Sequence, residues 1–230
     1  MVRTLALAAG LAISASAAQA AFTGVAYVEG DSAAASTAIG SAATVIQIFA
    51  VADGPGDGLF NTAVSTSFVN ITPVSGTFFQ SAFGTDLPPN AAFFPLAPDL
   101  MFDTFGTVGA ADNSGDGAAI SEEPGSAMDT TSIVGGFFNS NPPNNIGAAT
   151  DMGDGTFGTL LFQITVLGGG SGATVGPLEA MLNGEFTLFS FDPDNPQVPA
   201  ELHVNINVPT PGSLALFGIA GLAATRRRRA

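Results

Sequence analysis

Cysteine, lysine and tryptophan are absent from this chain of 230 residues, and histidine occurs once, at His203. Without cysteine there is no disulfide framework and no thiolate site, so core packing must hold the fold together. A zinc site would lack its sulfur ligands and a set of nitrogen ligands. Phosphoryl transfer would lack the cationic groups that clamp the phosphates. The composition therefore excludes zinc, thiol and phosphoryl-transfer chemistry.

Positive charge is confined to the two ends of the chain. The five basic residues are Arg3 and Arg226–Arg229, whereas all nineteen acidic residues lie between Glu29 and Glu201. A body freed of both ends would carry no lysine or arginine to pair with these carboxylates. Such a surface repels nucleic acid and anionic lipid, so we expect no nucleic-acid partner, and dissolved cations should stabilise the body.

The remaining composition favours a folded, turn-rich β protein. Hydrophobic residues make up 46% of the chain and charged residues only 10%, while glycine and proline number 29 and 15. Apolar content at this level supports a core, and the glycines and prolines predict many turns. Residues 21–208 are long enough for a single domain with a substantial core.

Eight segments of this region have strand character, and clusters of Gly, Pro, Asn and Asp separate them. They are 24–29, 44–52, 64–71, 76–80, 101–108, 158–166, 185–191 and 201–208. Apolar and polar residues alternate in 201–208 and in 158–166, which predicts strands with one buried and one solvent-facing side. Segment 44–52 is almost continuously apolar, which predicts a strand covered on both faces. Together they predict an all-β fold, an antiparallel β-sandwich of jelly-roll or immunoglobulin-like kind.

Other segments of the body are expected to be mostly loops. Only 177–182 has helical character, enough for one turn or two. Segment 87–99, rich in Pro, Ala and Phe, is expected to be an ordered loop laid over a sheet edge. Residues 110–132 and 139–154 are expected to form long acidic loops, and loops of this length often carry function.

The first twenty residues have the organisation of a signal peptide. A basic start at Arg3 is followed by an apolar run from Leu5 to Ile13 and by small residues that end in Ala18-Gln19-Ala20. This ending matches the A-x-A pattern that signal peptidase accepts. Residues 1–20 are therefore expected to be removed, so that the mature chain begins at Ala21.

Three elements follow one another in residues 209–230. They are the motif Pro209-Thr210-Pro211-Gly212, an apolar stretch at 213–224 and the cluster Arg226-Arg227-Arg228-Arg229. Twelve helical residues span about 18 Å, short of a hydrocarbon core of about 30 Å. We therefore expect the short hydrophobic helix to be a transient transmembrane anchor. The arginines favour the cytoplasmic side, which leaves the body outside.

This tail resembles the PEP-CTERM sorting signal, which exosortases process. Pro209, Thr210 and Pro211 fall on the family's Pro-Glu-Pro motif, and Thr210 departs from it because the family has Glu there. The resemblance covers about the last 23 residues and implies nothing about the fold of the body. It implies signal peptidase and an exosortase-like enzyme as partners, transient insertion into the inner membrane, and a final location at the cell surface or in the extracellular matrix.

The body is expected to have a non-enzymatic structural or interaction role. His203 would stand on the polar face of a strand, where a histidine is usually only solvated. Two-carboxylate glycoside hydrolysis needs only Asp or Glu, so it is the one enzyme class that the composition permits, although no spacing identifies such a pair. A carbohydrate-binding, adhesin-like module that contacts exopolysaccharide stays open as the other alternative. Its exposed rings could come from Phe78-Phe79, Phe93-Phe94 or Phe137-Phe138, since neighbouring residues of a strand face opposite sides.

Calcium is the candidate cofactor. The residues Asp112, Ser114, Asp116 and Glu123 occur at the spacing D-x-S-x-D-G-x5-E. This spacing matches a calcium loop, with oxygen ligands at alternate positions, a glycine at the sharp turn and a terminal carboxylate. The flanking helices of an EF-hand are missing. Segments 53–58 and 151–155 are weaker versions, equally explained as Asp-Gly turns.

Calcium is expected to raise the melting temperature of the secreted protein more than sodium does at matched ionic strength. Specific binding adds RT ln(1 + [L]/Kd), about 2.7 kcal/mol when the free ion is at about 100 times Kd. Melting scans of the wild type and of the double variant Asp112→Asn, Asp116→Asn in both salts measure this. Loss of the calcium increment in the variant would place the ion at residues 112–123. Equal gains from calcium and sodium in the wild type would contradict a specific site.

Overall fold

The computed structural model describes residues 22–56, 62–153, 155–168, 178–191 and 199–206. It is mostly β, with 48% of residues in strands and 16% in helices, and its two antiparallel sheets do not close into a barrel. The all-β prediction is confirmed at this level. No helix within the described ranges is long and apolar enough to cross a membrane.

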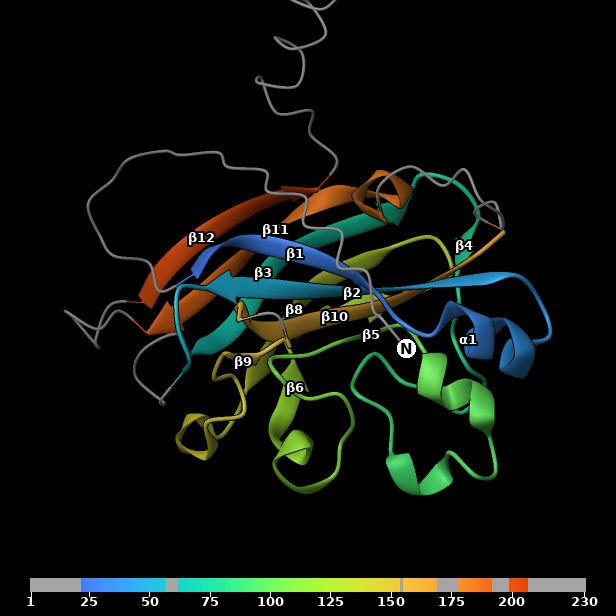
Figure 1. The fold of residues 1–230 in the computed structure, drawn as a ribbon, viewed down its shortest axis with the longest axis horizontal. Coiled ribbons are helices and arrows are strands. Elements are labelled where there is room, and N and C mark those ends of the chain that lie inside the picture. The colour runs from blue at the N-terminus through green and yellow to red at the C-terminus, as the bar shows by residue number, and fades with distance from the viewer. Residues whose placement is uncertain (1–21, 57–61, 154, 169–177, 192–198, 207–230) are drawn as a thin grey trace, which may run out of the picture.

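The first sheet has four strands in the order β1-β2-β10-β4, and two short strands also pair with β10. The four are β1 (Phe22–Glu29), β2 (Ala43–Ala52), β10 (Phe157–Leu167) and β4 (Thr77–Phe78), and the short ones are β5 (Phe105–Gly106) and β9 (Thr150–Asp151). Strand β1 therefore forms one edge of the sheet (Figure 1).

The second sheet has the order β12-β11-β3-β8-β6, and β7 also pairs with β8. Its strands are β12 (Pro199–Ile206), β11 (Leu182–Phe191), β3 (Ala63–Pro73), β8 (Ile133–Asn139), β6 (Ile120–Glu122) and β7 (Ala127–Met128). Strand β12 forms an edge, and it contacts β1 of the first sheet. The two ends of the described chain thus belong to neighbouring edge strands (Figure 1).

One hydrophobic core contains inner-face residues of both sheets. Phe162 of β10 is fully buried, and its ring meets Phe186 of β11 at 5.3 Å between centroids and Phe137 of β8 at 6.0 Å. Both pairs have edge-on geometry, which favours the contact of the positive ring edge with the negative ring face. Phe162 therefore connects the first sheet to two strands of the second.

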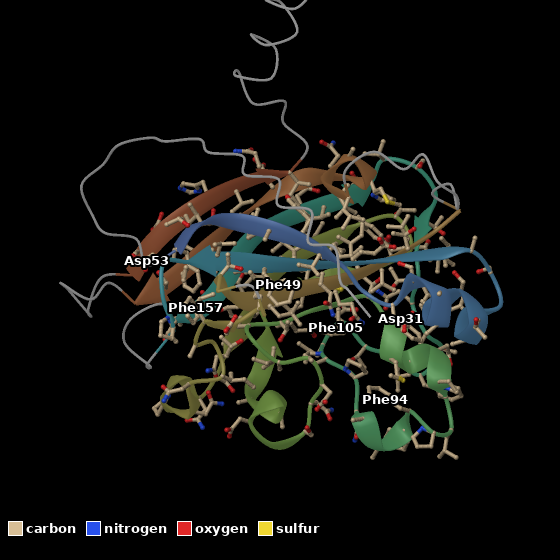
Figure 2. All side chains as sticks on the ribbon, in the orientation of Figure 1. Asp31, Phe49, Asp53, Phe94, Phe105 and Phe157 are labelled. Carbon is tan, nitrogen blue, oxygen red and sulfur yellow. The ribbon has the colours of Figure 1, made fainter. Side chains whose placement is uncertain are left out.

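Helix α1 (Ser32–Ile39) was not predicted from the sequence. It begins at Asp31, whose side chain accepts a hydrogen bond from the Ala34 N–H at 2.9 Å, and ends at Gly40 in the left-handed conformation. Figure 2 labels Asp31 at this start. Ala35 of the helix packs with Val45 of β2, so this end of β2 is covered on its outer side as well as by the core. Farther along, Gln47, Phe49 and Val51 are only half-buried, so the double-sided burial predicted for 44–52 is confirmed only at its start.

The alternation predicted for 201–208 is confirmed over the part that is described, whereas the solvent-facing side predicted for 158–166 is wrong. In β12, Val204 and Ile206 are buried and His203 is exposed. In β10 every residue from Gly158 to Val166 is buried. The reason is a covering segment, residues 79–107, which hydrogen-bonds to β10 at Thr107 N–H to Leu161 O, 2.8 Å, and Phe79 N–H to Thr165 O, 2.8 Å.

This covering segment also corrects the strands predicted at 76–80 and 101–108. Only two residues of each pair as strand, in β4 and β5, and Pro98–Phe102 form the 3-10 helix η2. The predicted loop at 87–99 contains a second 3-10 helix, η1 (Ala91–Phe93). It contacts η2, and η2 lies beside α1 (Figure 1). At 177–182, the predicted turn of helix is the 3-10 helix η5 (Leu178–Met181).

Strand β8 was missed because Gly135-Gly136 indicates a turn when only the sequence is considered. A Cβ on Gly136 would collide with the Glu123 carboxylate and with the Thr66 carbonyl oxygen. Glycine is therefore required here by close packing inside a sheet. The loops predicted at 110–132 and 139–154 also contain short elements: η3 (Gly115–Ala119), β6, β7, η4 (Pro142–Asn144) and β9.

Replacing Phe162 by alanine is expected to lower the free energy of unfolding by about 3–5 kcal/mol, because it leaves a cavity at the contact between the sheets. Urea unfolding of the variant and the wild type measures the difference. The matched control is Phe83→Ala, since Phe83 is 76% exposed and its loss should change stability by no more than about 0.5 kcal/mol. Equal losses in the two variants would contradict the role given to Phe162.

Candidate functional site

An exposed aromatic ring stands on the outer face of the second sheet. Phe68 of β3 is 76% exposed, and its φ of 55° places it in the left-handed region. Bulky residues rarely adopt this conformation, which costs about 1–3 kcal/mol. The register explains the position: Thr187 of β11 pairs with Ser67, and Glu185 with Asn70, so Phe68 falls within a bulge of β3. The fold thus holds this ring outward at an energetic cost.

A pocket of about 320 Å³ lies beside the ring. Its polar lining comes from Glu185 and Thr187 of β11 and from His203 and Asn205 of β12, and Phe186 and Val204 line it too. Thr187 pairs directly with His203, and Glu185 with Asn205. Because alternate residues of paired strands share a face, these four side chains lie on one side of the sheet. We call this site the Phe68 pocket.

One hydrogen bond orients the imidazole in the Phe68 pocket. The Oγ1 of Thr187 and the Nδ1 of His203 are 2.8 Å apart. In the tautomer in which Thr187 donates, the His203 Nε2 carries the proton and can donate to a ligand. The His203 side chain is 72% exposed, and its Nε2 lies 3.8 Å from the Glu201 Oε2.

Thr187, His203 and Glu201 follow the order of a nucleophile, a base and an acid, but their geometry differs from that of a catalytic triad. The Thr187 residue is only 4% exposed, so a substrate carbonyl could not approach its hydroxyl. The 3.8 Å between His203 and Glu201 exceeds hydrogen-bond distance. These three side chains are therefore better suited to holding a ligand than to attacking one.

Glu123, predicted as a calcium ligand, lies against the second sheet. Its carboxylate accepts a hydrogen bond from the Ser67 hydroxyl, next to Phe68. It lies over Gly136 of β8. The carboxylate therefore extends the polar surface around the Phe68 pocket toward β8.

The other predicted calcium ligands form a local turn. The Asp112 Oδ1 accepts a hydrogen bond from the Ser114 N–H at 2.8 Å, and Asp116 lies in the first turn of η3. Among the described residues, no group of three or more Asp, Glu or His side chains is placed to hold a metal ion, so Asp112, Asp116 and Glu123 are not brought together. At the weaker candidate, Asp151 accepts from the Gly153 N–H at 2.7 Å. Residues 57 and 154 lie outside the described ranges.

Sequence reasoning missed one buried carboxylate, Asp103, because it falls in a segment predicted as a strand. Asp103 belongs to the covering segment, and its side chain is fully buried there, where Oδ1 accepts from the Ser81 N–H at 2.7 Å. Its Oδ2 has no hydrogen-bond partner among the described residues and packs against Gly84. The Ser81 hydroxyl in turn donates to the Asp99 Oδ2 at 2.8 Å.

Burial raises the pKa of Asp103 to about 7. Hydrogen bonds from the Ser81 and Thr104 N–H groups oppose this shift, and the nearby carboxylates of Asp99 and Asp86 add to it. Burial also raises the pKa of Asp86, against the hydrogen bond that its carboxylate accepts from the Met128 N–H. In a protonated Asp103, the Oδ2 atom that lacks a partner would carry the proton and become an O–H donor.

The sorting and cleavage residues lie outside the described ranges. These are Ala18, Ala20, Ala21, Pro209, Thr210, Pro211, Gly212 and Arg226–Arg229. Comparison with known proteins finds no matching family model, no matching curated protein and no matching solved structure.

Protein stability is expected to fall as the pH rises from about 4 to about 7. In this window the folded chain keeps a proton on Asp103 that the unfolded chain has already released, so unfolding is favoured as protons are removed. The pKa change from 3.8 to about 7 corresponds to at most about 4 kcal/mol, at about 1.4 kcal/mol per unit. Urea unfolding across this pH window measures the slope.

The variant Asp103→Asn should lose this part of the slope, because an amide does not titrate there. Asp53→Asn, which removes an exposed carboxylate directly after β2, should keep it. An infrared band of a protonated carboxyl group in the wild type, below about pH 7, provides a readout that does not depend on a variant. A flat wild-type profile without this band would contradict a proton held on Asp103.

Proposed function

We propose that this chain is an exported, tail-sorted protein of the cell surface or extracellular matrix, with a non-enzymatic structural or interaction role. The sequence supports export through the signal-peptide pattern of residues 1–20 and sorting through the three-part tail of residues 209–230. The acidic body between them lacks the basic residues that nucleic-acid or anionic-lipid binding requires.

Both expected cuts lie outside the two described edge strands. Phe22 is buried in β1 and Ile206 is buried in β12, so these strands need the chain to stay intact from one to the other. The first lies one residue after the expected mature start at Ala21, and the second lies before the Pro209 motif. Removal of the leader and of the tail would therefore leave every described core residue in place.

The proposed partners are the enzymes that such ends require. Signal peptidase would cut after Ala20, and an exosortase-like enzyme would act at Pro209-Thr210-Pro211. During this step the short hydrophobic helix would insert transiently into the inner membrane, with the arginines on the cytoplasmic side. Thr210 gives the motif a different side chain from the family's glutamate, so we propose a sorting enzyme that accepts a hydroxyl there.

We further propose that the body is a β-sandwich of jelly-roll or immunoglobulin-like kind. Support comes from the core shared by the two sheets and from the ring contacts of Phe162 with Phe137 and Phe186. In a sandwich, the inner faces of two sheets interdigitate in this way and the outer faces stay available. Calcium remains our proposed stabilising ion for the acidic body.

A second candidate function is a carbohydrate-binding, adhesin-like module. The observation that favours it is the exposed Phe68 ring beside a pocket lined by polar side chains. Such a module needs an exposed ring or a carboxylate face, and Phe68 supplies the ring, although it is not one of the paired phenylalanines expected from the sequence.

Protein recovered from the cell surface is expected to begin near Ala21 and to lack Arg226–Arg229. Intact-mass measurement decides both points. Ala20→Phe should block the first cut, because signal peptidase requires a small residue there. Replacing the four arginines by serine should impair tail processing, whereas replacing them by lysine should preserve it, since lysine keeps the charge. Wild-type protein recovered with both ends intact would contradict the proposal.

A further inference from the structure

We propose that the Phe68 pocket binds an uncharged glycan. The Phe68 ring would lie against the apolar face of a sugar ring, and Glu185, His203 and Asn205 would bond to its hydroxyl groups. This inference rests on the interaction role proposed above and assigns it to a particular surface and class of ligand.

The ring provides the first argument. Phe68 is 76% exposed, although its segment carries buried residues on either side of the bulge, including Thr66 and Val69. An exposed ring in a left-handed conformation contributes little to the stability of the fold, and its backbone conformation costs free energy. Strain of this kind is often found at ligand-binding sites. A ligand that covers the ring removes its apolar surface from water, and this burial contributes favourable free energy to binding.

The polar lining provides the second argument. A sugar hydroxyl both donates and accepts hydrogen bonds, so its site needs groups of both kinds. Glu185 accepts, Asn205 does both, and His203 can donate through Nε2 when Thr187 holds Nδ1. The Thr187 hydrogen bond orients the His203 imidazole before a ligand arrives, and the pairing of β11 with β12 fixes the backbone positions of Glu185 and Asn205, which reduces the entropy lost on binding.

Charge provides the third argument. Glu185 lines the pocket, and Glu201 and Glu123 lie on the same outer face around it. Residues 22–206 contain no lysine or arginine. The site therefore repels uronic acids and sulfated sugars. A simple cation would need only the carboxylates and would leave the donors of His203 and Asn205 unused.

The volume and the location limit the length of the ligand. A pocket of about 320 Å³ is at the small end of ligand sites, which span about 300–1,000 Å³. It therefore holds a short segment of a glycan. The pocket reaches the edge strand β12, so the rest of a longer polymer can extend past the sheet.

The test is isothermal titration of the full chain with four oligosaccharides. Cellohexaose and maltohexaose are the uncharged probes, hexagalacturonate is the anionic probe, and the hexamer of glucosamine is the cationic one. We expect saturable binding of an uncharged probe and none of hexagalacturonate. Phe68→Ala should weaken binding by about tenfold or more, as for a ring at the centre of an interface. Phe68→Tyr keeps an aromatic ring and should bind like the wild type.

Two control variants distinguish binding at this pocket from binding elsewhere on the chain and from binding by charge alone. Phe83→Ala removes an equally exposed ring from the covering segment and should leave the affinity unchanged. Glu185→Gln keeps an acceptor but loses the charge, so binding of an uncharged glycan should weaken severalfold as a charge-assisted hydrogen bond becomes a neutral one, whereas binding that depends on charge would be abolished. The proposal is overturned if no uncharged probe binds, if both phenylalanine variants weaken binding equally, or if only the glucosamine hexamer binds.

The same samples keep this inference distinct from the proposed function. Absence of glycan binding would leave export and sorting, which intact mass decides, untouched. Release of reducing ends from a bound probe would overturn the non-enzymatic role while leaving the pocket as the binding site. Circular dichroism of each variant confirms that a lost affinity does not reflect a lost fold.

Discussion

The structure depends on one constraint: its carboxylates have no lysine or arginine within residues 22–206 to pair with. Backbone N–H groups and hydroxyls take that place. Asp31 caps a helix, Asp151 closes a turn, and Asp129 accepts hydrogen bonds from the hydroxyl and N–H of Thr131 and from the N–H of Ser132. These bonds lower the pKa of Asp129. These three carboxylates are thereby fixed locally, at a helix start and in two turns.

Asp103 shows the limit of this arrangement. It lies on the part of the covering segment that contacts β10, where Gln163 of β10 donates to the carbonyl oxygens of Met101 and Asp103, 2.9 and 3.2 Å away. Here the hydrogen bonds that the carboxylate accepts are not enough to offset burial, so the pKa rises instead of falling. The same contact leaves the Thr165 hydroxyl without a partner among the described residues. The protonation state of Asp103 therefore depends on how the covering segment packs against β10.

The sequence predicted well where one physical signal dominated. Alternation located the buried and exposed sides of β12, and a continuous apolar run identified β2 as a strand that is covered on both sides at its start. The Phe68 pocket could not be predicted, because it arises from a bulge and from the pairing of β11 and β12 with β3, which is distant from them in the chain. Burial of Asp103 depends on a segment of irregular backbone, whose position no local pattern specifies. The predicted calcium ligands matched a spacing, and spacing does not determine where Glu123 turns its carboxylate.

The location of the Phe68 pocket on β12 has a consequence for how the protein would act on a cell. Asn205, which lines the pocket, precedes Pro209 by four residues, and four residues reach at most about 14 Å however the chain runs. A protein attached through its sorting motif would therefore bind its ligand close to the point of attachment, and the rest of the body would lie farther from that point. It would then bind glycan at the surface of the cell that carries it, and it would be poorly placed to bind glycan on a neighbouring cell.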